Sequence, residues 1–150
     1  MYLKYNTEAL ILGHLERGES DRVFALYTKD FGLVRARASA VRSEKSKMRY
    51  ALQNYTYANV SLVRGKRGWR VAGASAIRSL HNGTVAVSAF ARIAQLITRL
   101  VHGEEVSAYL FAALVEAHEA LCTVPENIVP TIEIVCVARA LYALLKERYG

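Results

Sequence analysis

The stretch DRVFALYTKDFGLVRARASA, residues 21–40, decides the fold. Residues 21–28 predict one β-strand, the residues up to Gly32 predict a turn, and the remainder predicts a second strand with strict alternation. One face of this second strand carries small apolar residues: Val34, Ala36, Ala38 and Ala40. The other face carries Leu33, Arg35, Arg37 and Ser39. One face can therefore pack against a core while the other points two guanidinium groups into water.

The rest of the first half continues in the same way. Residues 7–16 are apolar on both faces, residues 51–63 form a long uncharged run, and residues 69–77 complete a hairpin. Short turns marked by glycine separate these segments. About five strands in roughly 70 residues predict a small closed or nearly closed β-barrel over residues 1–80.

Helical periodicity replaces the alternation after residues 81–83. In the next segment, apolar residues recur at three- and four-residue steps: Val87, Phe90, Ala94, Ile97 and Val101. This pattern predicts a helix that ends near Gly103. A third helix is predicted over Thr131–Glu147. The fold class is therefore α+β, with a five-stranded barrel followed by a small three-helix domain over residues 81–150.

Between these two helices the sequence predicts another, from about Glu104 to Leu121. Val106 and Tyr109 are expected to face inward. Glu104 and Glu105 are expected in the first turn, where a negative charge suits the positive end of the helix dipole.

Composition excludes several classes of protein. With 53% hydrophobic residues, 22% charged residues and two prolines among 150, the chain is neither disordered nor collagen-like. The longest apolar stretches, such as residues 106–115, are too short to cross a bilayer, and the N-terminus does not read as a secretory signal. Cys122 and Cys136 cannot form a four-ligand zinc site and are expected in the core. We therefore expect a soluble, cytoplasmic protein without a metal or other cofactor.

The net charge of +7 is unevenly distributed. Residues 1–80 hold fifteen Lys and Arg against six acids, whereas residues 81–150 hold five against seven. The first basic cluster comprises Arg35, Arg37, Arg42, Lys45, Lys47 and Arg49. The second comprises Arg64, Lys66, Arg67 and Arg70. Two clusters in one half favour a polyanionic partner, although solvated loops remain the alternative.

Catalytic motifs are missing from the sequence. The four histidines are scattered, so each is expected at the surface or at a helix cap, and no phosphate-binding glycine loop is present. His14, Ser20 and Asp21 lie close in sequence, but residues 18–21 are also a good hairpin turn. The chain is therefore not expected to be an enzyme.

Two aromatic residues are candidates for base stacking. Tyr55 and Tyr57 would share a polar strand face, which suits unpaired bases. The alternative is that both pack against the helical half. Trp69 alternates with Val71 and is expected in the core.

The chain resembles the RecO family of bacterial DNA-repair proteins. In the first half, the features that carry the resemblance are Gly18-Glu19-Ser20-Asp21, Thr28, Gly32, a basic stretch with Ser46, and Leu52-Gln53 followed by Tyr55. In the second half they are Gly103-Glu104-Glu105, Phe111, Leu144-Leu145 and Tyr149-Gly150. Their order and spacing along nearly the whole chain carry the resemblance, and no single motif does.

The resemblance implies an N-terminal OB-fold and a helical remainder. It implies binding of single- and double-stranded DNA, annealing of strands coated by single-stranded DNA-binding protein (SSB), and loading of RecA together with RecR. The first basic cluster would then line the DNA path, and the hairpin of residues 64–70 would extend it. Family members usually continue past Gly150, and many carry a cysteine zinc site. This sequence lacks such a site. The resemblance therefore leaves open whether this chain docks the SSB tail.

The functional hypothesis is a non-catalytic, nucleoid-associated DNA-binding and strand-annealing mediator of recombination after DNA damage. Two alternatives stay open. One is an RNA-binding OB-fold module, and the other is a protein-interaction adaptor whose basic lobe only keeps it soluble.

Overall fold

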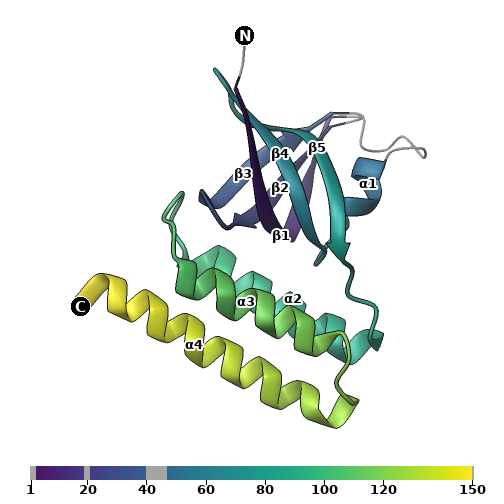
Figure 1. The fold of residues 1–150 in the computed structure, drawn as a ribbon, viewed down its shortest axis with the longest axis vertical. Coiled ribbons are helices and arrows are strands. Elements are labelled where there is room, and N and C mark those ends of the chain that lie inside the picture. The colour runs from purple at the N-terminus through teal and green to yellow at the C-terminus, as the bar shows by residue number, and fades with distance from the viewer. Residues whose placement is uncertain (1–2, 19–20, 40–46, 150) are drawn as a thin grey trace.

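The computed structural model describes residues 3–18, 21–39 and 47–149 of the chain. A β-barrel forms the first half, and a layer of helices lies across one end of it (Figure 1). This arrangement confirms the predicted α+β architecture. The predicted division into domains at residue 80 falls between the last strand and the first long helix, and it stays a prediction because both halves contribute to a shared core.

Five strands close the barrel in the order β1-β2-β3-β5-β4, the arrangement of an OB-fold. Their bounds are β1 Lys4–Arg17, β2 Asp21–Thr28, β3 Gly32–Ala38, β4 Tyr57–Gly65 and β5 Gly68–Arg78. β3 and β5 pair in parallel where Ala36 meets Trp69 and Arg37 meets Arg70, whereas the other pairs are antiparallel.

Alternation along β3 behaves largely as predicted. Val34, Ala36 and Ala38 are buried inside the barrel, and Arg35 is exposed on the other face. Leu33 differs, because it is also buried, in the cluster between the barrel and the helices. The fourth small residue of the predicted face, Ala40, lies outside the described residues.

The prediction of one strand over residues 51–63 is wrong at its start. A short helix, α1 (Lys47–Ala51), precedes a turn, and β4 begins only at Tyr57. Tyr55 has φ 67°, a left-handed conformation that no regular strand contains. Ala51 and Leu52 are buried in the barrel core, so α1 belongs to the barrel and covers part of its hydrophobic interior.

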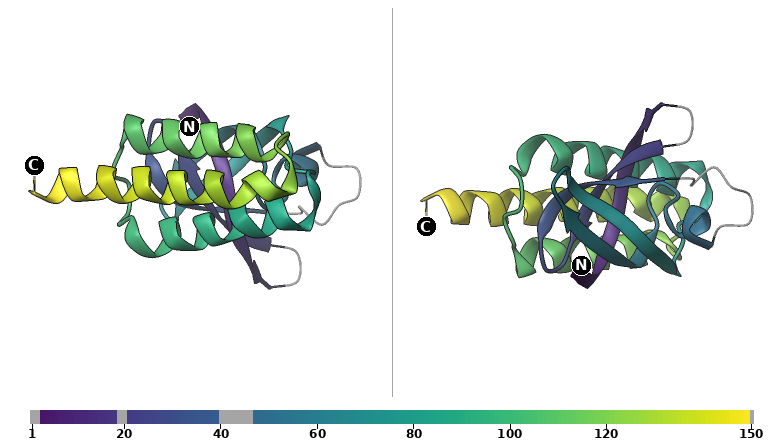
Figure 2. Two further views of the ribbon diagram at one scale, coloured as in Figure 1. Left: turned by 90° about the horizontal axis from the view of Figure 1, so that it is seen from below. Right: turned by 90° about the horizontal axis from the view of Figure 1, so that it is seen from above.

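Three long helices make up the second half: α2 Gly83–Leu100, α3 Ala108–Leu121 and α4 Val129–Tyr149, the last preceded by the 3-10 turn η1 Glu126–Ile128. Seen from below, α4 lies over the groove between α2 and α3, on the side away from the barrel (Figure 2). The apolar face of α2 is buried through Ala86, Phe90, Ile93 and Ile97.

The predicted start of α3 is wrong. The helix begins at Ala108, because the Ser107 hydroxyl caps it by accepting a hydrogen bond of 3.2 Å from the Leu110 amide. Glu104 and Glu105 therefore precede the helix and do not lie in its first turn. Val106 and Tyr109 are exposed and do not face the core.

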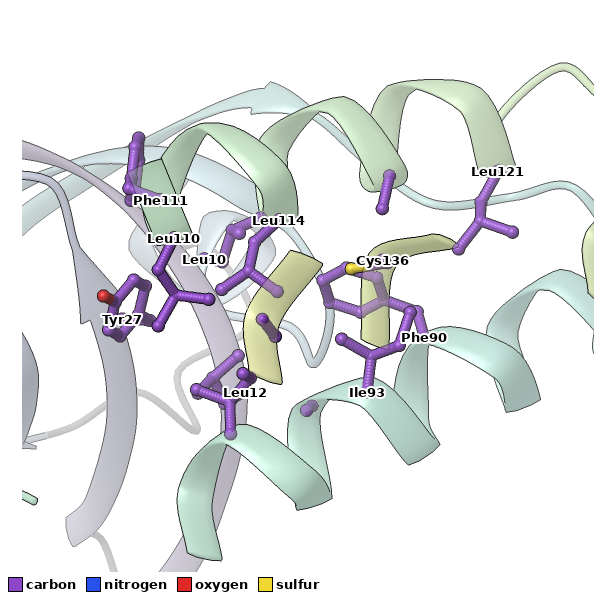
Figure 3. Packing of buried hydrophobic residues seen from close by; sticks show 14 of the residues in the cluster. Leu10, Leu12, Tyr27, Phe90, Ile93, Leu110, Phe111, Leu114, Leu121 and Cys136 are labelled. Carbon is purple, nitrogen blue, oxygen red and sulfur yellow. The ribbon is translucent and has the colours of Figure 1, made fainter. Parts of the chain in front are cut away.

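One buried cluster joins the two halves of the chain. Leu10, Leu12 and Tyr27 from the barrel meet Phe90 and Ile93 of α2, and further members come from α3 and α4: Leu110, Phe111, Leu114, Leu121 and Cys136 (Figure 3). Burial of this much apolar surface fixes the helical layer against the barrel end.

A buried histidine adds a polar link to this interface. The His118 side chain on α3 is fully buried, its Nε2 lies 2.8 Å from the Tyr55 carbonyl oxygen, and its Nδ1 accepts a hydrogen bond of 3.0 Å from Arg78 Nε. The pKa of His118 is lowered to about 4, because burial and, to a lesser extent, the positive charge of Arg78 outweigh the hydrogen bond to the Tyr55 carbonyl, which raises it. The neutral ring donates through Nε2, so the expected surface or capping position is wrong for this histidine.

A close backbone approach ties β3 to the loop after α2. The Leu33 amide donates to the Gly103 carbonyl oxygen at 3.2 Å. Gly32 has φ +69°, and a Cβ at this position would lie 2.5 Å from the Glu105 carbonyl oxygen. Only glycine satisfies both the conformation and the contact.

The expectation that no segment is long enough to cross a bilayer is wrong by length and composition. The helical segment Glu126–Arg148 has 23 residues. Its most apolar stretch of 18 residues has a mean hydropathy of 1.9, and 22% of that stretch is buried. One face of α4 nevertheless packs on the other helices through Val129, Cys136, Ala140 and Ala143.

Replacing Gly32 tests the close approach. Gly32→Ala is expected to cost about 2–3 kcal/mol more in unfolding free energy than Gly18→Ala, measured by chemical denaturation. Gly18 is the matched control because it has φ +67° and a Cβ added there would meet no atom within 4 Å, so its cost of about 1 kcal/mol reports the conformation alone. Equal costs at the two positions would contradict the packing argument.

Acid is expected to destabilise the fold through His118. The unfolded residue titrates near 6.5 and the folded residue at about 4, so the unfolded chain binds the extra proton in this window and stability falls as the pH falls. Between pH 7 and pH 5 this amounts to about 2 kcal/mol. In denaturation experiments, His118→Gln should lose this pH-dependent part of the unfolding free energy, whereas the exposed-site control His102→Gln should keep it. Identical pH profiles for wild type and His118→Gln would refute the assignment.

Candidate nucleic-acid interface

Predicted basic residues meet where β3 runs beside the β4–β5 hairpin. Parallel pairing of Arg37 with Arg70 brings the two basic clusters together, although they are far apart in sequence. Lys66 and Arg67 form the turn of the hairpin, and Gly65 pairs with Gly68 across it. We name this surface the basic track and define it by five residues: Arg35, Arg37, Lys66, Arg67 and Arg70.

Three adjoining hollows follow the basic track. The first, of about 300 Å³, is lined by four of its residues, namely Arg37, Lys66, Arg67 and Arg70. The second, of about 510 Å³, shares Gly68 and Trp69 with the first and adds Arg35 and Arg64. The third, of about 690 Å³, shares Arg35 with the second and lies between the barrel and α2. Shared walls make the hollows one concave path from the hairpin to the helices.

Track residues carry unneutralised positive charge. Across residues 3–18, 21–39 and 47–149, none of the five forms an ion pair with an acidic side chain. Arg64, next to them, differs because its guanidinium lies 3.0 Å from the Glu104 carboxylate and 5.0 Å above the Trp69 ring. The track thus offers donors to an external anion without the loss of an existing salt bridge.

Helix α2 and the loop after it contribute basic side chains that the sequence analysis did not single out. Arg92 and Arg99 line the third hollow, and His102 lines the second. These residues belong to the half of the chain with a slight excess of acids, so a search for basic runs passes over them. Among the three, Arg92 is held by Glu133 at 2.7 Å, while Arg99 is exposed.

The remaining residues of the first basic cluster are placed differently. Arg42 and Lys45 lie outside the described residues. Lys47 and Arg49 are exposed on α1, and neither lines the three hollows. The structure therefore brings Arg35 and Arg37 together with the second cluster and leaves Lys47 and Arg49 on a separate element.

The two tyrosines pack against the helices, as the alternative to base stacking expected. Tyr57 is buried, with its ring 6.4 Å from Phe111 and 6.2 Å from His118. Burial and a hydrogen bond from its hydroxyl to Glu8 raise the pKa of Tyr57 to about 12. Tyr55 is half-buried, with its ring 5.9 Å from Phe90. Neither ring stands free on a strand face as stacking requires.

Trp69 lies in the barrel core, as expected. Its ring is 7% exposed and contacts Phe31 at 5.2 Å and Tyr5 at 5.8 Å. Its indole lines the first and second hollows, and the Arg64 guanidinium lies above its ring.

Cysteines, histidines and acids do not gather into a metal site in the part of the chain that the structure describes. Cys136 is buried, and burial raises the pKa of its thiol to about 11, as expected for a core residue. Ser20 of the sequence cluster near His14 lies outside the described residues. Asp21 opens β2 opposite Arg17 in the hairpin.

Comparison with known proteins gives a consistent result. A family model described as "Recombination protein O N terminal" matches residues 1–80. A protein of Dehalococcoides mccartyi named DNA repair protein RecO is 40% identical over 78 residues, which cover 52% of this chain and 31% of that protein. A protein of Heliobacterium modesticaldum with the same name is 31% identical over 128 residues, covering 83% and 46% respectively. The chain thus spans less than half the length of these relatives.

Proposed function

The chain belongs to the RecO family, and from that premise we propose that it is a non-catalytic DNA-binding protein that anneals complementary strands during recombinational repair. Its relatives are named DNA repair proteins. The observation that carries the proposal is the basic track, whose five cations lie along one concave path without neutralising partners among the described residues.

Annealing needs little more than such a surface. Two strands repel one another through their phosphates, and cations that contact the phosphates lower this repulsion. Contacts to the backbone fix the path of a strand but do not read its sequence. The strand therefore stays free to shift its register until it meets its complement. Arg35, Arg37, Lys66, Arg67 and Arg70 supply these contacts in the proposal, with Arg64 and Arg99 at the margins.

Partners follow from the family. We propose single- and double-stranded DNA as ligands, SSB-coated strands as the working substrate, and RecR as the protein with which the chain assists RecA loading. The site of action is the cytoplasm, at the nucleoid. The DNA-binding and annealing steps require no cofactor and no membrane in this proposal, because they rest on contacts between cations and phosphates.

Removing track residues is expected to weaken DNA binding for every sequence. Each of two double variants, Arg35→Ala/Arg37→Ala and Arg67→Ala/Arg70→Ala, should make the log–log salt slope on single strands shallower by about 1.4, and their combination by about 3. Fluorescence anisotropy over a salt series measures this slope. The control Arg17→Ala/Lys29→Ala removes the same charge away from the track and should keep the wild-type slope.

The same titration separates the proposal from its rivals. Stronger binding to RNA than to DNA oligomers of equal length would indicate an RNA-binding module. A wild-type slope near zero, or equal losses in the track and control variants, would leave the basic residues as solubilising groups and favour the adaptor.

Strand annealing is the direct test of activity. Purified chain should accelerate annealing of two complementary labelled oligonucleotides, faster at low than at moderate salt, and the combined track variant should lose most of this acceleration. Repeating the assay on SSB-coated strands asks whether the chain also acts on the working substrate. DNA binding without any acceleration on bare strands would refute the annealing step while leaving the binding proposal in place.

A further inference from the structure

The floor of the third hollow is a flat, largely apolar part of the barrel surface. Gly13 of β1 pairs with Ala25 of β2, and Ala25 pairs with Arg35 of β3, so the three residues lie side by side on one face of the sheet. All three line the hollow. A Cβ added at Gly13 would meet no atom within 4 Å. The row therefore leaves open space above two nearly bare strands.

Apolar side chains surround this floor. Leu15 of β1 and Val23 of β2 form another cross-strand pair that lines the hollow, and Leu15 is 72% exposed. Leu12, which belongs to the buried cluster between barrel and helices, also lines it. Ala91 of α2 lines the wall opposite the barrel. Apolar surface of this kind is open to water and gains free energy when a ligand covers it.

Positive charge lies on both walls of the hollow. Arg35 comes from the barrel and Arg99 from α2, and both are exposed. Within the part of the chain that the structure describes, neither forms an ion pair with an acid. A fitting ligand therefore has an apolar part that covers the floor and anionic parts at its edges.

Two acids contact residues that line the hollow, and an arginine holds each of them. Glu16 lies 2.8 Å from Arg22 and 3.8 Å from His14. Glu133 lies 2.7 Å from Arg92. Both acidic charges are thus balanced within the protein, so an anion at the rim meets net positive charge.

An amide side chain completes the wall on α2. Gln95 lies one helical turn from both Ala91 and Arg99, is exposed, and lines the hollow. Its side chain makes no hydrogen bond within residues 3–18, 21–39 and 47–149. Because an amide both donates and accepts, it can meet the polar edge of different ring systems without selecting one.

From these observations we infer that the third hollow holds one unpaired nucleobase of a strand whose phosphates follow the basic track. The inference rests on the proposed DNA-binding function. It adds the site for the base, whereas the track accounts only for the phosphates. The planar base covers Gly13 and Ala25, its polar edge meets Gln95, and the flanking phosphates reach Arg35 and Arg99. Continuity selects this ligand, because the hollow shares Arg35 with the track.

A base site of this kind distinguishes single strands from duplex. An unpaired base enters the hollow at little cost, whereas a paired base would first have to leave its stack. Contacts to phosphates alone do not make this distinction through the bases. The third hollow thus gives the chain a preference for single strands that is independent of sequence.

Filling the hollow without changing any charge tests the inference. Gly13→Leu places a side chain in open space, and the φ of Gly13 lies outside the left-handed region, so the fold should tolerate it. The control Gly73→Leu adds the same side chain on β5, where an added Cβ would lie 3.9 Å from the Ser61 Cβ, an ordinary contact. Gly73 lines none of the three hollows. Circular dichroism verifies that both variants fold.

Fluorescence anisotropy then compares two oligomers with the same number of phosphates, an oligothymidylate and a chain of abasic deoxyribose phosphates. Wild type and Gly73→Leu should bind the oligothymidylate about tenfold more tightly than the abasic oligomer. Gly13→Leu should bind both oligomers equally, at the abasic level. The salt slope and the affinity for duplex should be the same in all three proteins, because every charge is kept.

Different outcomes reject the inference and the function on which it rests. Equal binding of the two oligomers by wild type, or a preference that survives in Gly13→Leu, would overturn the base site and leave salt-dependent DNA binding in place. A wild-type chain that binds neither oligomer at low salt would reject the proposed DNA-binding function itself. If wild type does not distinguish the oligomers but binds a labelled peptide of Asp and Leu, and Gly13→Leu abolishes that binding, the hollow belongs to a protein partner and the inference is wrong.

Discussion

The relation between barrel and helices depends on a buried imidazole that has to remain neutral. The left-handed turn at Tyr55 points its carbonyl toward the helices, where no strand partner reaches it, and His118 donates to this oxygen. Arg78 at the end of β5 satisfies the other ring nitrogen and also donates to the Val115 carbonyl of α3. Strand β5, the turn before β4 and helix α3 therefore share a single hydrogen-bonded group, and the surrounding apolar cluster keeps water away from it.

This junction also shapes the basic track. The third hollow lies between the barrel and α2, so its walls keep their spacing only while the helices stay docked. Gly32 and the loop after α2 hold the second hollow in the same way, since Leu33 of β3 and Gly103 of that loop both line it. The surface proposed to bind DNA is thus built from both halves of the chain, although nearly all of its charge comes from the first.

Sequence periodicity predicted the features that depend on local alternation. Strand β2 has the predicted bounds, and β3 exposes Arg35 while burying the small residues on its other face. The same pattern gave a wrong prediction of one strand over residues 51–63. Residues 51–57 are uncharged like the strand that follows, although they contain a helix end and a left-handed turn. The role of His118 had no local signal, since a single histidine on an apolar helix reads the same whether it is buried or capping. Its partners lie 40 and 63 residues away in sequence.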